Sequence, residues 1–346
     1  MFDVFLGFAF MASATVANKY ALTALSLLLM VGLRMLCAGI ILYLYYRKKS
    51  HRLSFGYFKH DLPILLGISL LTMLVPALFK AFALKHMLAS KAAFIASLDP
   101  FVTALYSYLF WGEHLTKKKV IGIILGFTGT LILLISSSAG ENSLMAFSIF
   151  SYPEIAAFLA MAIGRIGWMF VQQLLRKERY TPAEVNGLLM TISGILAFII
   201  PFIFAAIVPV LIFIPRFSLF AANYSFSDAA QFLYPHVNSS SHLFWVVFAV
   251  IYTIVIGNVL GYTMYAQFLK RHSATFVSLA GFSVPLYVYL FSNVLLGEPL
   301  SLNFLAASVV TFIGLMIFYQ DEINKISHGS WHPMEWLKSK FSRSIE

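Results

Sequence analysis

Residues 83–134 read ALKHMLASKAAFIASLDPFVTALYSYLFWGEHLTKKKVIGIILGFTGTLILL, and residues 268–319 read FLKRHSATFVSLAGFSVPLYVYLFSNVLLGEPLSLNFLAASVVTFIGLMIFY. A shift of 185 residues aligns the two stretches without a gap. Both hold the end of one apolar helix, small residues at the start of the next, a proline within it, a Gly-Glu turn and a later glycine. The matching positions, in the stretches and just before them, are Ala81, Leu84 and Lys85 with Ala266, Leu269 and Lys270, Ala89 and Ser90 with Ala274 and Thr275, Pro100 with Pro285, Gly112-Glu113 with Gly297-Glu298, and Gly129 with Gly314. The chain therefore contains an internal repeat.

The rest of the chain is strongly apolar. Of its 346 residues, 60% are hydrophobic and 11% are charged. Soluble domains are about 45–50% apolar and about 25% charged, so this composition excludes a water-soluble globular protein. Long apolar runs predict ten membrane spans of roughly 20 residues each. They are Val4–Leu22, Leu27–Tyr46, Leu62–Leu84, Ala92–Trp111, Val120–Ile135, Ile155–Leu175, Val185–Val208, Leu243–Leu269, Ala274–Leu296 and Phe304–Tyr319.

The ten runs form two groups of five, and each copy of the repeat lies in one group. Because five is odd, the second group must enter the membrane in the opposite sense. We therefore expect an all-α polytopic membrane protein with ten transmembrane helices as two inverted five-helix repeats. The expected parts are repeats at 1–138 and 154–320, an external loop at 209–242 and a cytoplasmic tail at 321–346. Inverted repeats are typical of secondary carriers, although a duplicated scaffold without transport has the same pattern.

Basic residues predict the orientation of these spans. With the N-terminus inside, seventeen of the 24 Lys and Arg residues fall in cytoplasmic segments and three fall in the opposite loops. Positive charge favours the cytoplasmic side, so we expect both termini there. The first apolar run lacks the basic start and the cleavage site of a signal peptide, so we expect it to remain as a span. The expected location is the plasma membrane, which is the inner membrane in a bacterium.

The two quoted stretches resemble the paired EamA domains of the drug/metabolite transporter superfamily. MASATVANKYALT in the first span and LRMLCAG in the second also resemble that family's first helices. The resemblance extends over residues 4–320. It implies a ten-helix carrier of small metabolites such as amino acids and their derivatives, S-adenosylmethionine-like compounds included. Asp99 departs from the pattern, which usually has glutamate or a neutral residue before the proline.

Five ionisable residues lie within the predicted spans: Lys19, Arg34, Lys80, Asp99 and Arg165. Each costs at least about 2.5–3.5 kcal/mol on insertion, so each needs a reason to be there. At 1.5 Å per residue, Arg165 lies about 15 Å from the outer end of its span, Arg34 and Asp99 lie about 10 Å deep, and the lysines lie about 5–6 Å deep. Four cations against one carboxylate predict a cavity that opens outward and binds a carboxylate or a phosphate.

Most of these charged residues also have a structural explanation that involves no substrate. Lys19 and Lys80 are shallow enough to extend to the outer interface. Arg34 can pair with Asp99 as an internal strut. Arg165 is too deep to reach water along its own helix, and no carboxylate of the second half lies at its depth. Arg165 is therefore the leading candidate for a substrate-binding residue.

Asp99 precedes Pro100, whose missing N–H and bulky ring loosen the helix. A carboxylate beside a helix break fits two roles, one as the acceptor of a coupling proton and the other as the partner in a salt bridge to Arg34. Pro100 and Pro285 are related by the repeat. They are expected to be hinge points in the rocking of the two halves, or kinks that do not move.

Span eight places Asn258, Tyr262 and Tyr265 on one helix face. This pattern predicts a binding wall with hydrogen-bonding and aromatic surface. Trp168 lies one turn after Arg165 and is placed to stack on a planar or cationic part of a substrate. Polar residues in spans also join helices to each other, and a tryptophan also packs, so both uses stay open.

Other functional classes have less support in the sequence. No HExxH, CxxC, GxSxG or P-loop motif occurs, and the single Cys37 excludes a disulfide framework and a cysteine metal cluster. We expect no enzymatic activity, no cofactor or metal and no nucleic-acid partner. The predicted function is secondary active transport, by alternating access, of a small polar metabolite that bears a carboxylate. The expected partners are this substrate and the lipid bilayer. A coupling proton is a possible further partner, and the sequence does not distinguish a monomer from a dimer. The alternatives are an integral-membrane enzyme, a non-transporting scaffold and, within transport, a nucleotide or nucleotide-sugar carrier.

Overall fold

The computed structural model describes residues 2–49, 55–112, 114–137, 146–147, 150–175, 181–211, 240–272, 274–299 and 301–327. Most of the expected external loop at 209–242 and most of the expected tail at 321–346 lie outside these residues.

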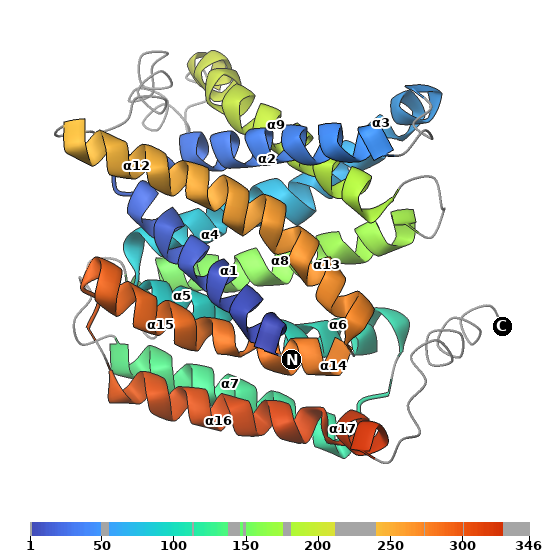
Figure 1. Ribbon diagram of the computed structural model, residues 1–346, viewed down its shortest axis with the longest axis vertical. Coiled ribbons are helices and arrows are strands. Elements are labelled where there is room, and N and C mark those ends of the chain that lie inside the picture. Colours follow the sequence, from blue (N-terminus) through green and yellow to red (C-terminus); the bar gives the residue numbers. More distant parts are fainter. Residues whose placement is uncertain are drawn as a thin grey trace.

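The described chain is helical apart from one pair of two-residue strands (Figure 1). Its α-helices are α1 (Phe2–Ala21), α2 (Leu27–Lys49), α3 (Phe55–Ser69), α4 (Val75–His86), α5 (Ala89–Ala96), α6 (Asp99–Trp111), α7 (Lys117–Ser137), α8 (Tyr152–Leu175), α9 (Pro182–Leu211), α12 (Ser240–Tyr252), α13 (Gly261–Arg271), α14 (Ala274–Gly281), α15 (Ser283–Leu296), α16 (Leu302–Phe318) and α17 (Gln320–Ser327). Two π-helical segments, η1 (Leu70–Leu74) and η3 (Thr253–Leu260), join α3 to α4 and α12 to α13. Strands β1 (Ala146–Phe147) and β2 (Phe150–Ser151) pair antiparallel just before α8.

Seven helical segments of the described chain are long and apolar enough to cross a membrane. They are Leu27–Tyr45, Asp61–His86, Ala89–Phe110, Tyr152–Leu175, Glu184–Ile203, His242–Tyr265 and Phe276–Leu296, and α16 is a shorter apolar helix. Many large apolar side chains on these segments face outward, as lipid contact requires. The prediction of a helical membrane protein is confirmed. The count of ten spans and their inverted relation remain predictions.

Two of the segments are interrupted where the sequence predicts a loosened helix. Between α5 and α6, the N–H groups of Leu98 and Phe101 donate to carbonyls three residues earlier, at 3.2 and 2.9 Å. Pro100 has no N–H to continue the α-helical pattern, so the chain tightens for one turn and starts again at Asp99. The same break separates α14 from α15. Gly112 and Gly297 end α6 and α15 with φ of 65° and 70°, a left-handed conformation that glycine adopts without strain.

Close helix crossings depend on small residues. Figure 1 shows α9 crossing α2, and α7 lying beside α16 along the opposite edge of the molecule. A Cβ on Gly39 of α2 would lie 2.5 Å from the backbone nitrogen of Thr191 in α9. A Cβ on Gly122 of α7 would lie 2.6 Å from the carbonyl oxygen of Gly314 in α16. Glycines at these two crossings therefore let the helix backbones approach closely.

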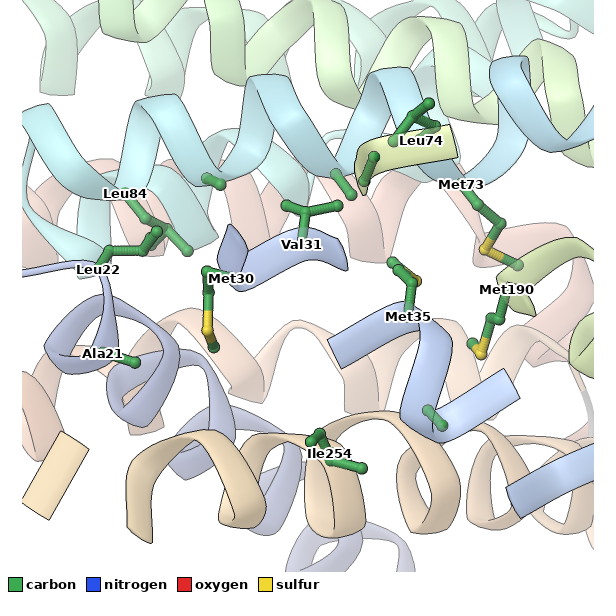
Figure 2. Close-up of a cluster of buried hydrophobic side chains, with 14 of the residues drawn as sticks. Ala21, Leu22, Met30, Val31, Met35, Met73, Leu74, Leu84, Met190 and Ile254 are labelled. Carbon is green, nitrogen blue, oxygen red and sulfur yellow. The ribbon is translucent and has the colours of Figure 1, made fainter. Parts of the chain in front are cut away.

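The main apolar core lies where α1, α2, α4, α8 and α9 meet (Figure 2). Leu22, Met30, Leu74 and Leu84 are at most 1% exposed. Met35, Met73 and Met190 belong to this cluster, and their unbranched side chains fill irregular gaps. Because Met35 and Met73 also line the cavity described next, this core holds the cavity wall in place.

Candidate functional site

A cavity of about 450 Å³ lies among the helices. This volume is within the range of sites for small molecules, about 300–1,000 Å³. Seven of the predicted site residues line it: Arg34, Lys80, Asp99, Arg165, Trp168, Asn258 and Tyr262. The other lining residues include Met11, Ala14, Thr15, Asn18, Thr72, Pro76, Ala83, Ala92, Ala96, Ala157, Ala160, Gly164, Thr253, Gly257 and Val284. Three cations and one carboxylate make the described wall positively charged.

The two π-helical segments both contribute to this wall. Thr72 belongs to η1, while Thr253, Gly257 and Asn258 belong to η3. A π-turn is wider than an α-turn, so it shifts the side chains that follow onto another face, and π-turns are frequent at functional sites. Here it turns polar residues of two long apolar segments toward the cavity.

Asp99 pairs with Arg165 and not with Arg34, so the predicted strut between Arg34 and Asp99 is wrong. Arg165 Nε donates to Asp99 Oδ1 at 2.8 Å, and Arg165 Nη2 contacts Asp99 Oδ2. The reason is helix packing, because α8 lies against α5 and α6 and brings its arginine to the start of α6. Depth along the membrane, which the sequence shows, does not reveal which helices are neighbours. Both side chains stay partly exposed, at 24% and 35%.

Arg34 and Lys80 have no carboxylate partner among the described residues. Arg34 is buried, and its Nε has no hydrogen-bond partner in the described part of the chain. Its carbonyl oxygen accepts a hydrogen bond from Asn258 Nδ2 at 3.4 Å. Lys80 is near enough to Arg34 to interact with it electrostatically. The cavity thus holds two neighbouring cations that the described residues leave uncompensated.

An aromatic pair forms another part of the wall. The rings of Trp168 and Tyr262 stack with centroids 6.4 Å apart and planes 29° apart. Tyr265, expected on the same face as Asn258 and Tyr262, is 42% exposed and does not line the cavity, although it interacts electrostatically with Arg165. The change from the π-helical η3 to α13 alters the angular spacing that the prediction assumed.

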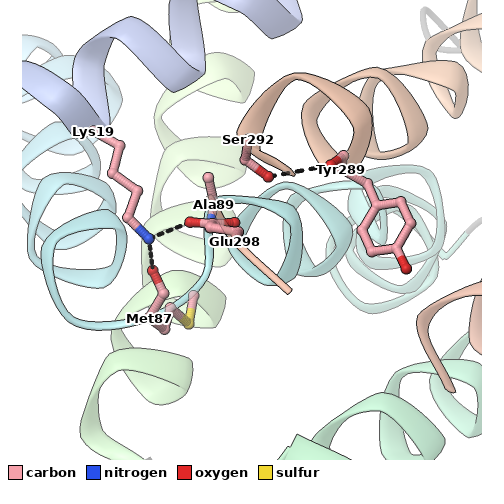
Figure 3. Close-up of polar contacts among 6 residues, drawn as sticks. All are labelled: Lys19, Met87, Ala89, Tyr289, Ser292 and Glu298. Carbon is pink, nitrogen blue, oxygen red and sulfur yellow. Dashed lines mark hydrogen bonds and ion pairs between the residues drawn. The ribbon is translucent and has the colours of Figure 1, made fainter. Parts of the chain in front are cut away.

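Lys19 lies outside the cavity lining. Its ammonium group pairs with Glu298 and donates to the carbonyl oxygen of Met87 at 2.7 Å (Figure 3). The carboxylate of Glu298 also accepts from the N–H of Ala89, at 2.9 and 3.0 Å for its two oxygens. These contacts, which we name the Lys19–Glu298 latch, join the end of α1 to the start of α5 and to the turn after α15. Glu298 belongs to the Gly-Glu pair of the repeat, but only the fold shows that Lys19 is its partner.

A second ion pair lies at the same end of α5. Lys91 in α5 pairs with Glu154 in the first turn of α8, and the side chains are 1% and 4% exposed. Both residues lie one position outside the expected spans Ala92–Trp111 and Ile155–Leu175. Pro100 and Pro285, the expected hinges, begin α6 and α15 and do not line the cavity. In the described parts of the chain, no group of three His, Cys, Asp or Glu residues is placed to hold a metal.

A charged cavity enclosed by apolar helices is typical of a membrane carrier. The chain belongs to the EamA-like transporter family, whose model matches residues 1–135 and 151–320. This family assignment and the relatives below point to a transporter rather than an enzyme.

Two bacterial transporters are similar to the chain over nearly its whole length. The "S-adenosylmethionine/S-adenosylhomocysteine transporter" of Chlamydia muridarum is 26% identical over 328 residues, which cover 94% of this chain and 93% of that protein. The protein of the same name from Chlamydia trachomatis serovar L2 is 24% identical over 331 residues, with 94% and 90% covered. A solved crystal structure has a similar fold, with a TM-score of 0.51 and 19% identity over 91% of this chain and 93% of that one.

Proposed function

We propose that the protein is a secondary active carrier that moves a small carboxylate-bearing metabolite of the S-adenosylmethionine type by alternating access. The observation that carries the proposal is the pair of uncompensated cations, Arg34 and Lys80, facing a cavity beside the aromatic pair Trp168 and Tyr262. The names of the Chlamydia relatives support this substrate class.

The two cations favour an anionic group on the substrate. Arg34 is buried, and taking its charge out of water costs several kcal/mol, which an opposite charge with good hydrogen bonds offsets. Arg34 offers a planar fork that matches a carboxylate, and Lys80 offers a second positive charge beside it. A bound carboxylate would satisfy both. A phosphate would also do so, which keeps a nucleotide or nucleotide-sugar carrier as the alternative.

The aromatic pair favours a planar group at the other part of the substrate. Trp168 and Tyr262 present ring surface to the cavity, and an adenine ring stacks well on such a surface. A sulfonium group beside an aromatic face is attracted as other cations are. A molecule with a carboxylate at one end and adenosine at the other therefore matches both features of the wall.

The inverted repeat is part of the proposal, and the element boundaries support it. A shift of 185 residues carries α5 onto α14 and places η1 within η3. The same shift carries the left-handed Gly112 onto Gly297. The same shift also carries α7 onto residues 302–322, which include α16, and α7 packs on α16. We infer two halves of five spans each, with the cavity between them.

We further propose that both termini are cytoplasmic and that the carrier lies in the plasma membrane, or in the inner membrane of a bacterium. The excess of Lys and Arg in alternate loops supports this orientation. With both termini cytoplasmic, the Lys19–Glu298 latch and the Lys91–Glu154 pair would lie at the external end of the cavity. Both pairs tie α5 to neighbouring helices, so an alternating-access cycle must break or move them to open that end.

The latch gives a test of alternating access. In a protein with Cys37→Ala and Ala96→Cys, the new thiol faces the cavity, because Ala96 is exposed and lines it. Glu298→Gln removes the charge that holds Lys19, so we expect external labelling of that thiol by an impermeant maleimide to rise about tenfold. Lys19→Gln should do the same. The control Asp321→Asn breaks an exposed pair with Lys118 of 2.6 Å and should leave labelling unchanged. Equal labelling in all variants would remove the latch from the gating step.

Substrate flux tests the function itself. Purified protein in sealed proteoliposomes is expected to exchange external labelled S-adenosylmethionine for internal S-adenosylhomocysteine. Arg34→Gln should lower this exchange about tenfold to a hundredfold, because a hydrogen bond to a charged group is lost. Lys118→Gln, which changes an exposed cation outside the cavity, is the matched control. Exchange of nucleotides or nucleotide sugars with no exchange of S-adenosyl compounds would establish the alternative, and no flux of either would contradict the carrier.

A further inference from the structure

Two ion pairs join α8 to the same neighbouring segment, α5–α6. Lys91 in α5 pairs with Glu154 in the first turn of α8, and Asp99 at the start of α6 pairs with Arg165 further along α8. At 1.5 Å per residue, the two positions on α8 are about 16 Å apart. Both members rise in number from the first pair to the second, so the two segments run in the same direction. They are therefore joined at two well-separated points.

The charges follow opposite orders on the two segments. The α5–α6 segment carries a cation and then an anion, whereas α8 carries an anion and then a cation. Sliding α8 by one turn would break both pairs at once. Lys91 and Glu154 are 1% and 4% exposed, and breaking a buried pair is strongly destabilising because each charge loses its compensation. The two pairs therefore hold α8 to α5–α6 in one register, and α4 packs along α8 as well.

The Lys19–Glu298 latch is attached to α5 in a different way. Its ion pair lies between α1 and the turn after α15, and these two helices pack on each other. Backbone hydrogen bonds connect it to the start of α5: Lys19 donates to the Met87 carbonyl oxygen at 2.7 Å, and the Ala89 N–H donates to the Glu298 carboxylate at 2.9 and 3.0 Å (Figure 3). Water can replace such bonds when this end opens, so their loss costs less than the separation of a buried ion pair.

We propose that Lys91 and Glu154 are a positioning pair that, with the Asp99–Arg165 pair, keeps α8 and α5–α6 together as one moving body. The external end of the cavity then opens between the latch and the start of α5. This inference rests on the proposed alternating access and adds which contacts persist through it. Arg165 and Trp168, which line the cavity from α8, keep their places beside α6 in both orientations of the carrier. The moving bodies thus differ from the two halves of the sequence, because α8 begins the second half and moves with helices of the first.

External labelling separates a positioning pair from a gate, in the same Ala96→Cys protein that tests the latch. The test variant carries Lys91→Met and Glu154→Gln together and is expected to fold, because no buried charge is left without a partner. Glutamine still offers an oxygen to the Ser151 N–H, which Glu154 Oε2 accepts at 2.8 Å. We expect labelling of this variant to stay at the background level, whereas Glu298→Gln raises it about tenfold.

Covalent links test the same two boundaries during transport. In the Cys37→Ala protein, Lys91→Cys and Glu154→Cys are joined by a short bifunctional methanethiosulfonate reagent, so that a covalent link replaces the ion pair. Ala89→Cys and Glu298→Cys, joined by the same reagent, tie the start of α5 to the turn after α15. Exchange of S-adenosylmethionine for S-adenosylhomocysteine in proteoliposomes is expected to persist with the first link and to fall at least about tenfold with the second. Reduction of the second link should restore exchange.

The outcomes separate this inference from the proposed function. A rise in labelling of the Lys91→Met, Glu154→Gln variant to the level of Glu298→Gln would make the pair a gate and overturn its positioning role. Loss of exchange with the first link, restored by reduction, would do the same. Exchange that survives the second link would overturn the opening between the latch and α5. A protein without exchange before linking contradicts the carrier, and labelling then still decides the role of the pair.

Discussion

Asp99→Asn is expected to lower the yield of folded protein and the exchange of substrate together. The change leaves Arg165 without its carboxylate, and breaking a buried ion pair costs about 3–5 kcal/mol. Because the two side chains are 24% and 35% exposed to the cavity, the lower end of that range applies here. The double variant Asp99→Asn with Arg165→Gln removes the orphaned charge and should recover most of the yield. Fluorescence-detected size-exclusion chromatography of the solubilised protein measures this directly.

The same variant tests the other role proposed for Asp99. If Asp99 carries a coupling proton, Asp99→Asn should abolish accumulation driven by a pH gradient and retain counterflow exchange, because the site still binds and moves its substrate. Loss of yield with rescue by Arg165→Gln supports the structural role. A well-folded single variant with unaltered pH dependence would contradict both roles. Uptake with and without a proton gradient, at equal protein content, separates the cases.

Gly39→Ala is expected to destabilise the protein strongly although it adds one carbon atom. The new Cβ would lie 2.5 Å from the backbone nitrogen of Thr191 and 2.9 Å from its Cα, so α2 and α9 would have to move apart. Overpacking of this kind costs about 1–3 kcal/mol, and more when backbone must move. Gly194→Ala, whose Cβ would lie 2.5 Å from the nitrogen of Leu36, should behave in the same way.

Gly67→Ala is the matched control for the helix crossing. Gly67 lies within α3, and nothing is within 4 Å of the position of an added Cβ. Alanine there should leave the thermal midpoint of the detergent-solubilised protein unchanged or raise it. Equal midpoints for Gly39→Ala, Gly194→Ala and Gly67→Ala would show that the crossing tolerates a wider separation than the glycines suggest.

In the proposed site, the two cations and the two aromatic residues would recognise different parts of a substrate. In the proposed site, Arg34 and Lys80 attract a carboxylate from any source, whereas Trp168 and Tyr262 accept many planar groups. Neither pair by itself distinguishes an S-adenosyl compound from a nucleotide.

Much of this molecule follows from local sequence. Apolar runs place the helical segments, because a segment in lipid must satisfy its backbone internally. Pro100 predicts the break between α5 and α6, and the Gly-Glu pairs predict the turns that Gly112 and Gly297 make with positive φ. The cost of charge in a membrane singles out five residues, of which Arg34, Lys80, Asp99 and Arg165 line the cavity and Lys19 does not.

The ion-pair partners of the charged side chains are known only from the tertiary structure. Asp99 meets Arg165 and not Arg34, and Lys19 meets Glu298, a residue 279 positions away in the chain. Asn18 and Thr72 also line the cavity, although single polar residues are common in apolar helices and do not mark a site in the sequence. Hydropathy and local propensity set where a helix begins, ends and lies in the bilayer. Which of its faces meets which neighbour depends on the packing of side chains from distant segments, and no single segment contains that information.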